Sequence, residues 1–516
     1  MKRRGAVAAG HALTADAAAA MLEEGGNAFD AALAAFFTAC VVEPVLCALG
    51  GGGFLVAAPE DSRPLAYDFF TQTPRFKRPA DELDFWPVHA DFGVTTQEFH
   101  IGLGSIATPG CVKGVAAIHR DLCTVPLREL CQPAVQHARE GFAMTPFQAD
   151  LLNVVKPIYV VAPEVKAVYA PSDSGKLLAV GDTMRQAELG ETIDILCIEG
   201  EELFYRGEIA RIIDEESRQG GGHLRRADLE QYAVHRRAPL RVRYRDAQLA
   251  INPPPSAGGI LVAFALGLLE TRAVGATAFG SPAHIELLSD VMALSNKARI
   301  DEQARNDEGG IDERRMLAPH FIERYSQMVA GRAHAARGTT HISVADSAGN
   351  IAAMTISNGE GCGSLLPGTG VMLNNMLGEE DLNPGGFHQW KPDQRMSSMM
   401  APAVLMHADG GAVALGSGGS NRIRTAILQV VSNLIDFGMD VEAAVTSPRI
   451  HFEKDTLSIE GGDDWERLHE FLAGLPDRNV FPGLNVFFGG AHVVQKDARG
   501  FHGCGDPRRG GVYREV

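Results

Sequence analysis

A long hydrophobic run is missing from this chain of 516 residues. The longest apolar stretch, residues 31–42, stops at Glu43 and Pro44 and is too short to cross a bilayer. The basic start, residues 1–4, is followed by a segment containing His11 instead of the apolar core of a signal peptide. We therefore expect a cytoplasmic protein without a membrane segment, and a periplasmic one only if the true start lies upstream.

Paired cysteines and excess positive charge are also absent. None of the 8 cysteines forms a C-x-x-C pair, which argues against a zinc ribbon or a dithiol redox motif. Several lie in apolar runs, where cysteine usually acts as a small buried hydrophobe, so a reducing compartment is the simpler interpretation. The formal net charge of -17 argues against a nucleic-acid partner, because phosphates require a basic surface.

Several familiar catalytic and cofactor signatures are missing as well. The chain contains no G-x-S-x-G elbow, no H-E-x-x-H helix and no G-x-G-x-x-G after a strand. The glycines of LGGGGF, residues 49–54, lack the G-K-[ST] that completes a phosphate loop, so close backbone packing or a tight turn is expected there. The 17 histidines show no ligand-like spacing, and we expect neither a metal nor a cofactor.

The elements that the sequence does contain change in character along the chain. Alanine-rich helices are expected at 14–24 and from Asn27 to Pro44, followed by a strand and, later, a helix at 260–270. No fixed-period repeat and no low-complexity linker divides the chain. After residue 338 strands predominate: 340–345 and 351–357 form a predicted hairpin, and a strand at 412–415 leads to a helix at 422–437.

Thr339 stands at the start of that hairpin, directly after Gly338. A threonine hydroxyl needs a base beside it, and the α-amine of an N-terminal threonine can be that base, since its pKa is roughly 7.7–8.0. A threonine within a chain reaches this state by attacking the preceding carbonyl, and glycine tolerates the geometry that this attack requires. From these residues alone, ordinary strand propensity at Thr339 remains the commoner explanation.

Two further segments have both a catalytic and a structural interpretation. GSGGSN, residues 416–421, precedes a helix and can aim backbone N–H groups at an oxyanion, although a plain strand-to-helix turn is commoner. RMSS, residues 395–398, places two hydroxyls near an arginine, which by itself is unremarkable for a protein surface.

Together these pieces resemble the γ-glutamyltranspeptidase (γ-glutamyltransferase) family of N-terminal-nucleophile hydrolases, and the resemblance extends over essentially the whole chain. The matching motifs occur in family order: EEGGNAFDAA (23–32), LGGGGF (49–54), GSIATPGCVKG (104–114), FYRGEIA (204–210), PPPSAGG (253–259), TTHISVADSAGN (339–350), MLNN (372–375), RMSSMMAP (395–402), GSGGSNRI (416–423), DFGMDVEAAVTSPRIH (436–451) and GDPR (505–508).

The resemblance implies an α+β fold, a four-layer αββα sandwich. It also implies self-cleavage between Gly338 and Thr339, giving a large chain 1–338 and a small chain 339–516 that form one interleaved unit. The implied partners are a small γ-glutamyl or similar amide substrate and the two chains of the heterodimer itself. A dimer of heterodimers is left open.

Specific site residues are carried over from the family's motifs. Thr339 is implied as the nucleophile, Gly418 and Gly419 as the oxyanion glycines, and Ser357 as a hydroxyl that orients the nucleophile. For the glutamyl head, Ser397 and Ser398 are implied in holding the α-carboxylate, and Glu379, or alternatively Asp381, in binding the α-amine. Asn358 is a further implied substrate-binding residue, displaced by one position from where the family's asparagine is expected.

This sequence departs from the family where the substrate carboxylate is bound. Phe70 stands where the family's carboxylate-binding arginine is expected, and phenylalanine cannot make a bidentate guanidinium contact. Arg75 is nearby but out of register. Met376 follows the paired asparagines in place of a glutamine or glutamate, and the short segment 384–395 implies that a lid over the site is missing.

Three functions are therefore weighed. The first is an autoprocessed threonine amide hydrolase or acyl transferase acting on glutathione-like γ-glutamyl amides. The second keeps the mechanism but takes another acyl group, as in the related cephalosporin (glutaryl) acylases, and is motivated by Phe70. The third is an unprocessed relative that only binds a ligand. Whether water or an amine accepts the acyl group is left open.

Overall fold

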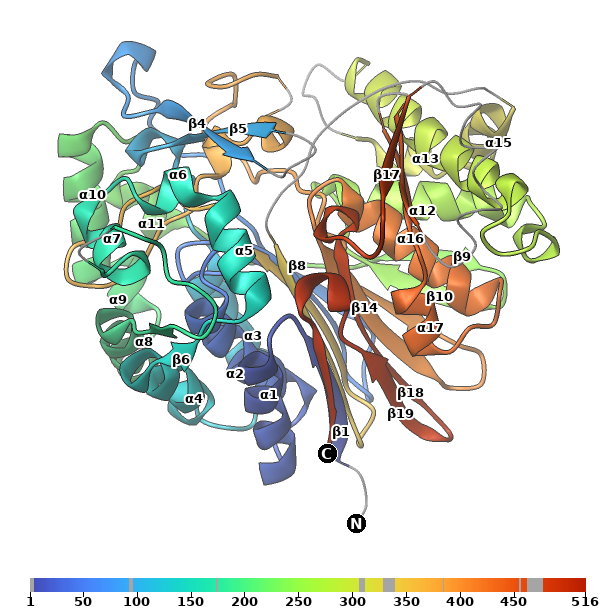
Figure 1. Cartoon of the computed structure of the whole chain (residues 1–516), viewed down its shortest axis with the longest axis horizontal. Helices are drawn as coiled ribbons and strands as arrows, with labels where there is room; N and C mark the ends of the chain where they lie inside the picture. The colour runs from blue at the N-terminus through green and yellow to red at the C-terminus, as the bar shows by residue number, and fades with distance from the viewer. Residues whose placement is uncertain are drawn as a thin grey trace.

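The structure, a computed structural model, describes residues 4–91, 96–172, 175–305, 311–327, 339–383, 385–453, 456–461 and 477–516. Two sheets lie face to face at the centre, and a layer of helices covers the outer face of each (Figure 1). This is the four-layer αββα sandwich that the sequence predicted.

The first sheet has seven strands, and every neighbouring pair is antiparallel. In spatial order the strands are β20 (Val512–Glu515), β1 (Gly5–Ala9), β11 (Thr340–Asp346), β12 (Ile351–Ser357), β2 (Gly52–Ala58), β3 (Leu65–Phe69) and β8 (His235–Arg237).

The second sheet has six antiparallel strands. In spatial order they are β19 (Gly500–Cys504), β18 (Gly490–Asp497), β14 (Ala412–Gly418), β13 (Ala403–Met406), β10 (Ala247–Ile251) and β9 (Leu240–Tyr244).

The two helical layers come from different parts of the chain. Near the first sheet lie α1 (Ala12–Glu24), α2 (Ala28–Val42), α3 (Cys111–Leu122), α4 (Leu127–Glu140) and α8 (Ala187–Glu199). Near the second lie α12 (Ala257–Glu270), α13 (Pro282–Gln303), α16 (Arg422–Ile435) and α17 (Val441–Thr446). Among the helices of the described ranges, none is both long and apolar enough to span a membrane.

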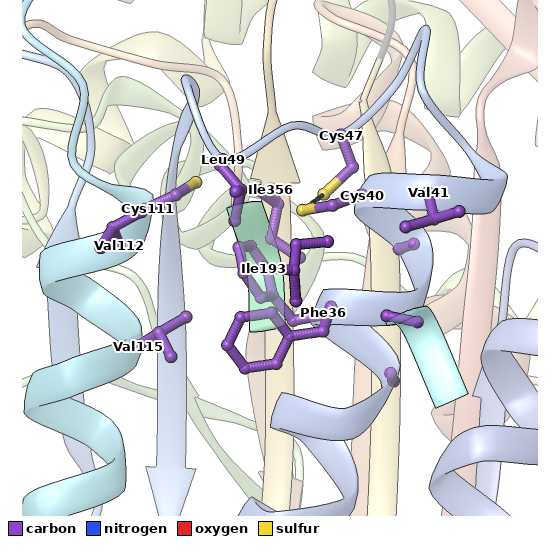
Figure 2. Packing of buried hydrophobic residues seen from close by; sticks show 14 of the residues in the cluster. Phe36, Cys40, Val41, Cys47, Leu49, Cys111, Val112, Val115, Ile193 and Ile356 are labelled. Atoms are coloured by element: carbon purple, nitrogen blue, oxygen red, sulfur yellow. Dashed lines mark hydrogen bonds between the residues drawn. The ribbon is translucent and has the colours of Figure 1, made fainter. Parts of the chain in front are cut away.

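Local chemistry explains the start of the first helical layer. Gly25 ends α1 in the left-handed conformation, and Asn27 then caps α2 through a reciprocal capping box with Asp30. The predicted N-cap at Asn27 is thus confirmed, and every residue of the helix that follows it is buried. Figure 2 shows how Phe36 and Cys40 of this helix pack close to Cys47 and Cys111, whose thiols are free.

The strands alternate between a helix-facing and a sheet-facing side. Val7 of β1 and Ile342 of β11 belong to the cluster under the first helical layer, whereas Ala6, Ala8 and Ala345 point toward the other sheet. The side chains between the sheets are mainly alanine and valine, which lets the two sheets approach closely. Small residues in alternate positions therefore define the inner layers of the sandwich.

Most of the elements predicted for the C-terminal part are confirmed. The hairpin pairs Thr340 with Ile356, the strand before GSGGSN is β14, and its helix ends at Ile435, two residues earlier than predicted. The glycines at 50–53 serve close packing, as expected: a Cβ at Gly51 would lie 2.4 Å from the carbonyl oxygen of Ser357.

Strands from both sides of residue 338 share the first sheet. Between β1 and β2, which precede it, lie β11 and β12, which follow it, and β20 pairs with the other edge of β1. A backbone cut near residue 338 would leave all of these ladders intact. A division into 1–338 and 339–516 would thus divide the chain and not the fold.

Candidate active site

Thr339 lies immediately before β11, at the edge of the space between the two sheets. It is buried, with 4% of its surface exposed. Its carbonyl oxygen accepts a hydrogen bond of 3.1 Å from Nη1 of Arg509. The preceding residue of the predicted cleavage junction, Gly338, lies outside the described residues.

The GSGGSN segment meets Thr339 directly. Gly418 ends β14, and a Cβ on it would lie 1.9 Å from the carbonyl oxygen of Thr339, so no larger residue fits there. Gly419 has φ 120 and Ser420 has φ 54, both in the left-handed half of backbone space. This sharp turn directs the chain into α16, which begins at Arg422. Sequence-distant Gly418 and Thr339 are therefore brought into contact.

A cavity that is partly open to solvent lies beside Thr339. Its lining combines hydroxyls, two acids and an apolar wall. The lining residues are Phe70, Thr339, Ser357, Met376, Glu379, Asp381, Leu382, Ser398, Met399, Met400, Ser420 and Ile423. Among these residues there is no lysine, arginine or histidine.

The two acids lie in consecutive short turns. Glu379 is buried with 3% of its surface exposed, and it caps the 3₁₀ turn that contains Asp381. Oδ2 of Asp381 accepts a 3.0 Å hydrogen bond from the Ser420 hydroxyl, which ties this turn to the glycine turn. Both residues suggested from sequence for an amino group thus reach the cavity.

Phe70 forms part of the apolar wall, where the family's arginine was expected. It is buried and stacks on Phe54 with the ring centroids 5.4 Å apart. Its carbonyl oxygen accepts hydrogen bonds from Tyr232, at 2.7 Å, and from the guanidinium of Arg395. Nε of Arg395 also lies 3.6 Å from Oδ1 of Asp68, so the positive charge of Arg395 is already paired with a carboxylate.

Only some of the other residues that the sequence suggested for substrate binding line the cavity. Ser357 and Ser398 line it, whereas Ser397 is exposed and Asn358 is fully buried without lining it. Arg75 pairs at the surface with Asp393, at 2.7 Å, consistent with its being out of register. The structure therefore brings one serine of the predicted pair to the site.

A buried acid supports the strand from the opposite side. Glu43 accepts 2.7 Å hydrogen bonds from the hydroxyls of Thr340 and Thr14. Burial raises the pKa of this carboxyl, while the two hydroxyls and the charge of Arg509 oppose the rise. Thr340 is thus more than a continuation of the strand, since it anchors the start of β11 to the end of α2.

His341, the next residue of the same strand, is held by two hydroxyl groups. Its Nδ1 lies 2.7 Å from the Thr355 hydroxyl and its Nε2 lies 2.9 Å from that of Ser343. Because Ser343 donates to the carbonyl of His492, we assign the proton to Nε2 of His341 and the acceptor role to Nδ1. Burial holds the pKa of His341 well below its usual value, so the ring is neutral.

Sequence reasoning did not single out Arg509, Glu43 or Ser420. The GDPR motif ends one residue before Arg509 and was the available signal for it; Ser420 lies within GSGGSN, and Glu43 was noted only as the end of an apolar run. Within the described residues no cluster of three or more His, Cys, Asp or Glu side chains has a geometry that could hold a metal ion.

Comparison with known proteins gives a consistent picture. The gamma-glutamyltranspeptidase family model matches residues 14–516. The acylase ACY 1 proenzyme of Pseudomonas sp. (strain V22) is 31% identical, covering 89% of this chain and 84% of the relative. The glutathione hydrolase proenzyme of Bacillus subtilis (strain 168) is 28% identical, covering 87% and 80%.

Solved structures share the fold. The cephalosporin acylase from Bacillus halodurans superposes with a TM-score of 0.83 at 22% identity, covering 99% of this chain and 96% of that structure. The family match over nearly the whole sequence is the decisive observation for identity. The chain therefore belongs to the gamma-glutamyltranspeptidase family and is an enzyme of the N-terminal-nucleophile hydrolase type.

Proposed function

We propose that the chain cleaves itself between Gly338 and Thr339 and that the freed Thr339 is the nucleophile of an amide hydrolase or acyl transferase. The carrying observation is the contact of Thr339 with the Gly418 turn at one end of an acid-lined cavity. Relatives described as proenzymes support the processing step. The product is one heterodimer of 1–338 and 339–516, with a shared sheet holding the chains together.

The proposed chemistry needs only groups of this chain. The α-amine of Thr339 takes the proton of its own hydroxyl as the oxygen attacks the amide carbonyl. Backbone N–H groups of the Gly418–Gly419 turn stabilise the oxyanion. The protonated amine then passes its proton to the leaving nitrogen, giving an ester on Thr339. Water or an acceptor amine attacks this ester and restores the hydroxyl.

We assign a γ-glutamyl group as the acyl donor. Glu379 and Asp381 can together neutralise the α-ammonium of the glutamyl head, and Ser398 offers a hydroxyl to its carboxylate. The cavity lining contains no cation that would favour a substrate bearing a carboxylate without an ammonium. With Phe70 in the wall, the carboxylate is held by neutral groups, so the ammonium carries most of the recognition.

A glutaryl-type acylase is the second candidate. It is favoured by Phe70, which removes the expected carboxylate clamp, and by the 31% identity to an acylase. A glutaryl group has a terminal carboxylate and no ammonium. In this cavity it would face Glu379 and Asp381 and would be repelled by both.

Three anilide substrates separate the two candidates. Relative to the γ-glutamyl anilide, the 4-aminobutyryl anilide lacks the carboxylate and the glutaryl anilide lacks the ammonium. We expect kcat/KM to fall modestly for the 4-aminobutyryl compound and by about 10–100-fold for the glutaryl compound, the usual cost of losing a charged hydrogen-bonding partner. A glutaryl anilide that reacts faster than the γ-glutamyl anilide would instead establish the acylase. Glycylglycine added to each reaction reports transfer to an amine.

Phe70→Arg tests the role of the cavity wall. A guanidinium at this position can form one ion pair with the carboxylate of the substrate, so we expect kcat/KM for the two carboxylate-bearing anilides to rise by about tenfold. The 4-aminobutyryl anilide has no carboxylate, and its kcat/KM should stay unchanged or fall. Phe70→Met keeps the wall apolar and is the matched control. Equal changes for all three substrates would mean that residue 70 does not contact the acyl group's carboxylate.

A further inference from the structure

Arg509 is a buried cation that the proposed chemistry does not yet use. It ends the short turn Pro507–Arg509, and its side chain runs back into the site, where Nη1 bonds the Thr339 carbonyl. The path is cleared by glycines: a Cβ at Gly490 would lie 2.4 Å from Cδ of Arg509, and one at Gly418 or Gly419 would lie 3.2 Å from its terminal nitrogens. A side chain at any of these three glycines would crowd Arg509, so the glycines leave room for its side chain where it lies.

The charge of this side chain is poorly compensated by direct contacts. Among the described residues no carboxylate makes a direct ion pair with Arg509, and its buried Nε has no hydrogen-bond partner. Burial lowers its pKa to about 10, and Glu360, Asp506 and Glu43 oppose that effect from a distance. The guanidinium nevertheless remains charged at neutral pH. Its Nη1 donates a hydrogen bond to the carbonyl of Thr339, the residue that the proposed function makes the nucleophile.

We propose that Arg509 is a positioning residue that holds the Thr339 carbonyl and, by its charge, keeps the amino group released by cleavage deprotonated and ready to act as the base. The inference rests on the proposed function. Amine and carbonyl belong to the same residue, so a protonated amine would lie only a few ångströms from the guanidinium. Like charges at that separation disfavour the protonated form.

Other ionisable groups surround this position and set the size of the effect. Carboxylates favour the protonated amine, and the buried histidines are neutral, since burial lowers the pKa of His492 to about 4 and holds the pKa of His341 well below its usual value. The groups facing Thr339 and Arg509 from the neighbouring elements are Glu43, Glu360, Glu379, Asp381, Asp506, His341 and His492. Arg509 acts at close range, because its Nη1 bonds the Thr339 carbonyl directly.

The test measures the amine itself. Cyanate carbamylates an unprotonated α-amine, so the rate of mass gain on the small chain, followed against pH by mass spectrometry, gives the pKa of the Thr339 amine without any substrate. In the wild-type protein we expect a value below the ordinary range of roughly 7.7–8.0. A wild-type value within or above that range would overturn the inference, as would a wild-type chain that never exposes this amine.

Two substitutions separate charge from packing. Arg509→Gln keeps a hydrogen-bond donor but loses the charge, and we expect the amine pKa and the acid limb of kcat/KM to rise by about 1 unit. Arg509→Lys keeps the charge, and both should stay close to wild type. If both variants lose activity with no change in the amine pKa, the residue is merely structural and the inference is wrong.

The cyanate titration also distinguishes this inference from the choice of substrate. A processed enzyme that ignores every γ-glutamyl anilide, yet shows the lowered amine pKa and its rise in Arg509→Gln, would refute the proposed acyl donor alone. Normal turnover of γ-glutamyl anilide with an ordinary amine pKa would refute the role of Arg509 alone.

Discussion

Thr339→Ala yields a single uncleaved chain of 55.2 kDa on a denaturing gel and no amide turnover. The substitution removes the hydroxyl that performs both the proposed cleavage and the later acyl transfer. Loss of a covalent nucleophile costs at least about 10³-fold in kcat, and here the base also stays locked in a peptide bond. Gel electrophoresis, intact mass and kcat for the γ-glutamyl anilide measure the two losses separately.

Two variants serve as controls for this result. Thr339→Ser keeps a hydroxyl and should still divide at 338/339, although more slowly. Thr340→Ser keeps the hydroxyl that bonds Glu43 and should behave like the wild type. Division of Thr339→Ala at the same peptide bond would contradict self-cleavage by this residue, and an intact wild-type chain would favour a ligand-binding role.

Gly418→Ala removes activity while leaving the rest of the fold in place. The new Cβ would overlap the Thr339 carbonyl oxygen, 1.9 Å away, and neither partner can move without shifting β14 or β11. The displaced turn no longer presents its N–H groups to the oxyanion, and loss of one such donor typically costs about 10²–10³ in kcat. We therefore expect a loss at least this large, together with a lower Tm.

Gly483→Ala is the matched control, because a Cβ there would meet no atom within 4 Å. It should retain wild-type kcat and Tm. Wild-type kcat in Gly418→Ala would show that the glycine turn does not touch the reacting carbonyl. A lowered Tm with intact kcat would assign Gly418 to packing alone.

The layers of the sandwich were predictable because local patterns carry them, whereas the role of Thr339 as the nucleophile comes from the family resemblance and stays a prediction. Asn27 with Asp30 marks a helix start, and the alternation of residues 340–345 marks β11, whereas β1 was not among the predicted strands. Each signal lies within a few neighbouring residues. Where the sandwich agrees with the sequence, local preference and burial point the same way.

The remainder of the site depends on contacts between distant segments. Arg509 meets Thr339 across 170 positions of sequence, and Glu43 meets Thr340 across 297. Ser397 and Ser398 look equivalent in sequence, but only the alternation of an extended backbone decides that Ser398 faces inward. No local pattern encodes these outcomes, since they follow from how the two sheets are stacked.

The ends of the chain meet in the first sheet, beside the strand that begins at Thr340. The C-terminus lies beside β1 (Figure 1). The backbone N–H of Gly5 donates to the carbonyl of Val516 at 3.1 Å, and that of Val516 donates back to Gly5 at 3.0 Å. Adjacent termini permit circular permutation. A gene that joins 516 to 4 through a short linker and starts at Thr339, after an initiator residue that is removed, would make the nucleophile's amine by translation. Such an enzyme would bypass self-cleavage, so residues needed only for maturation would become dispensable in it.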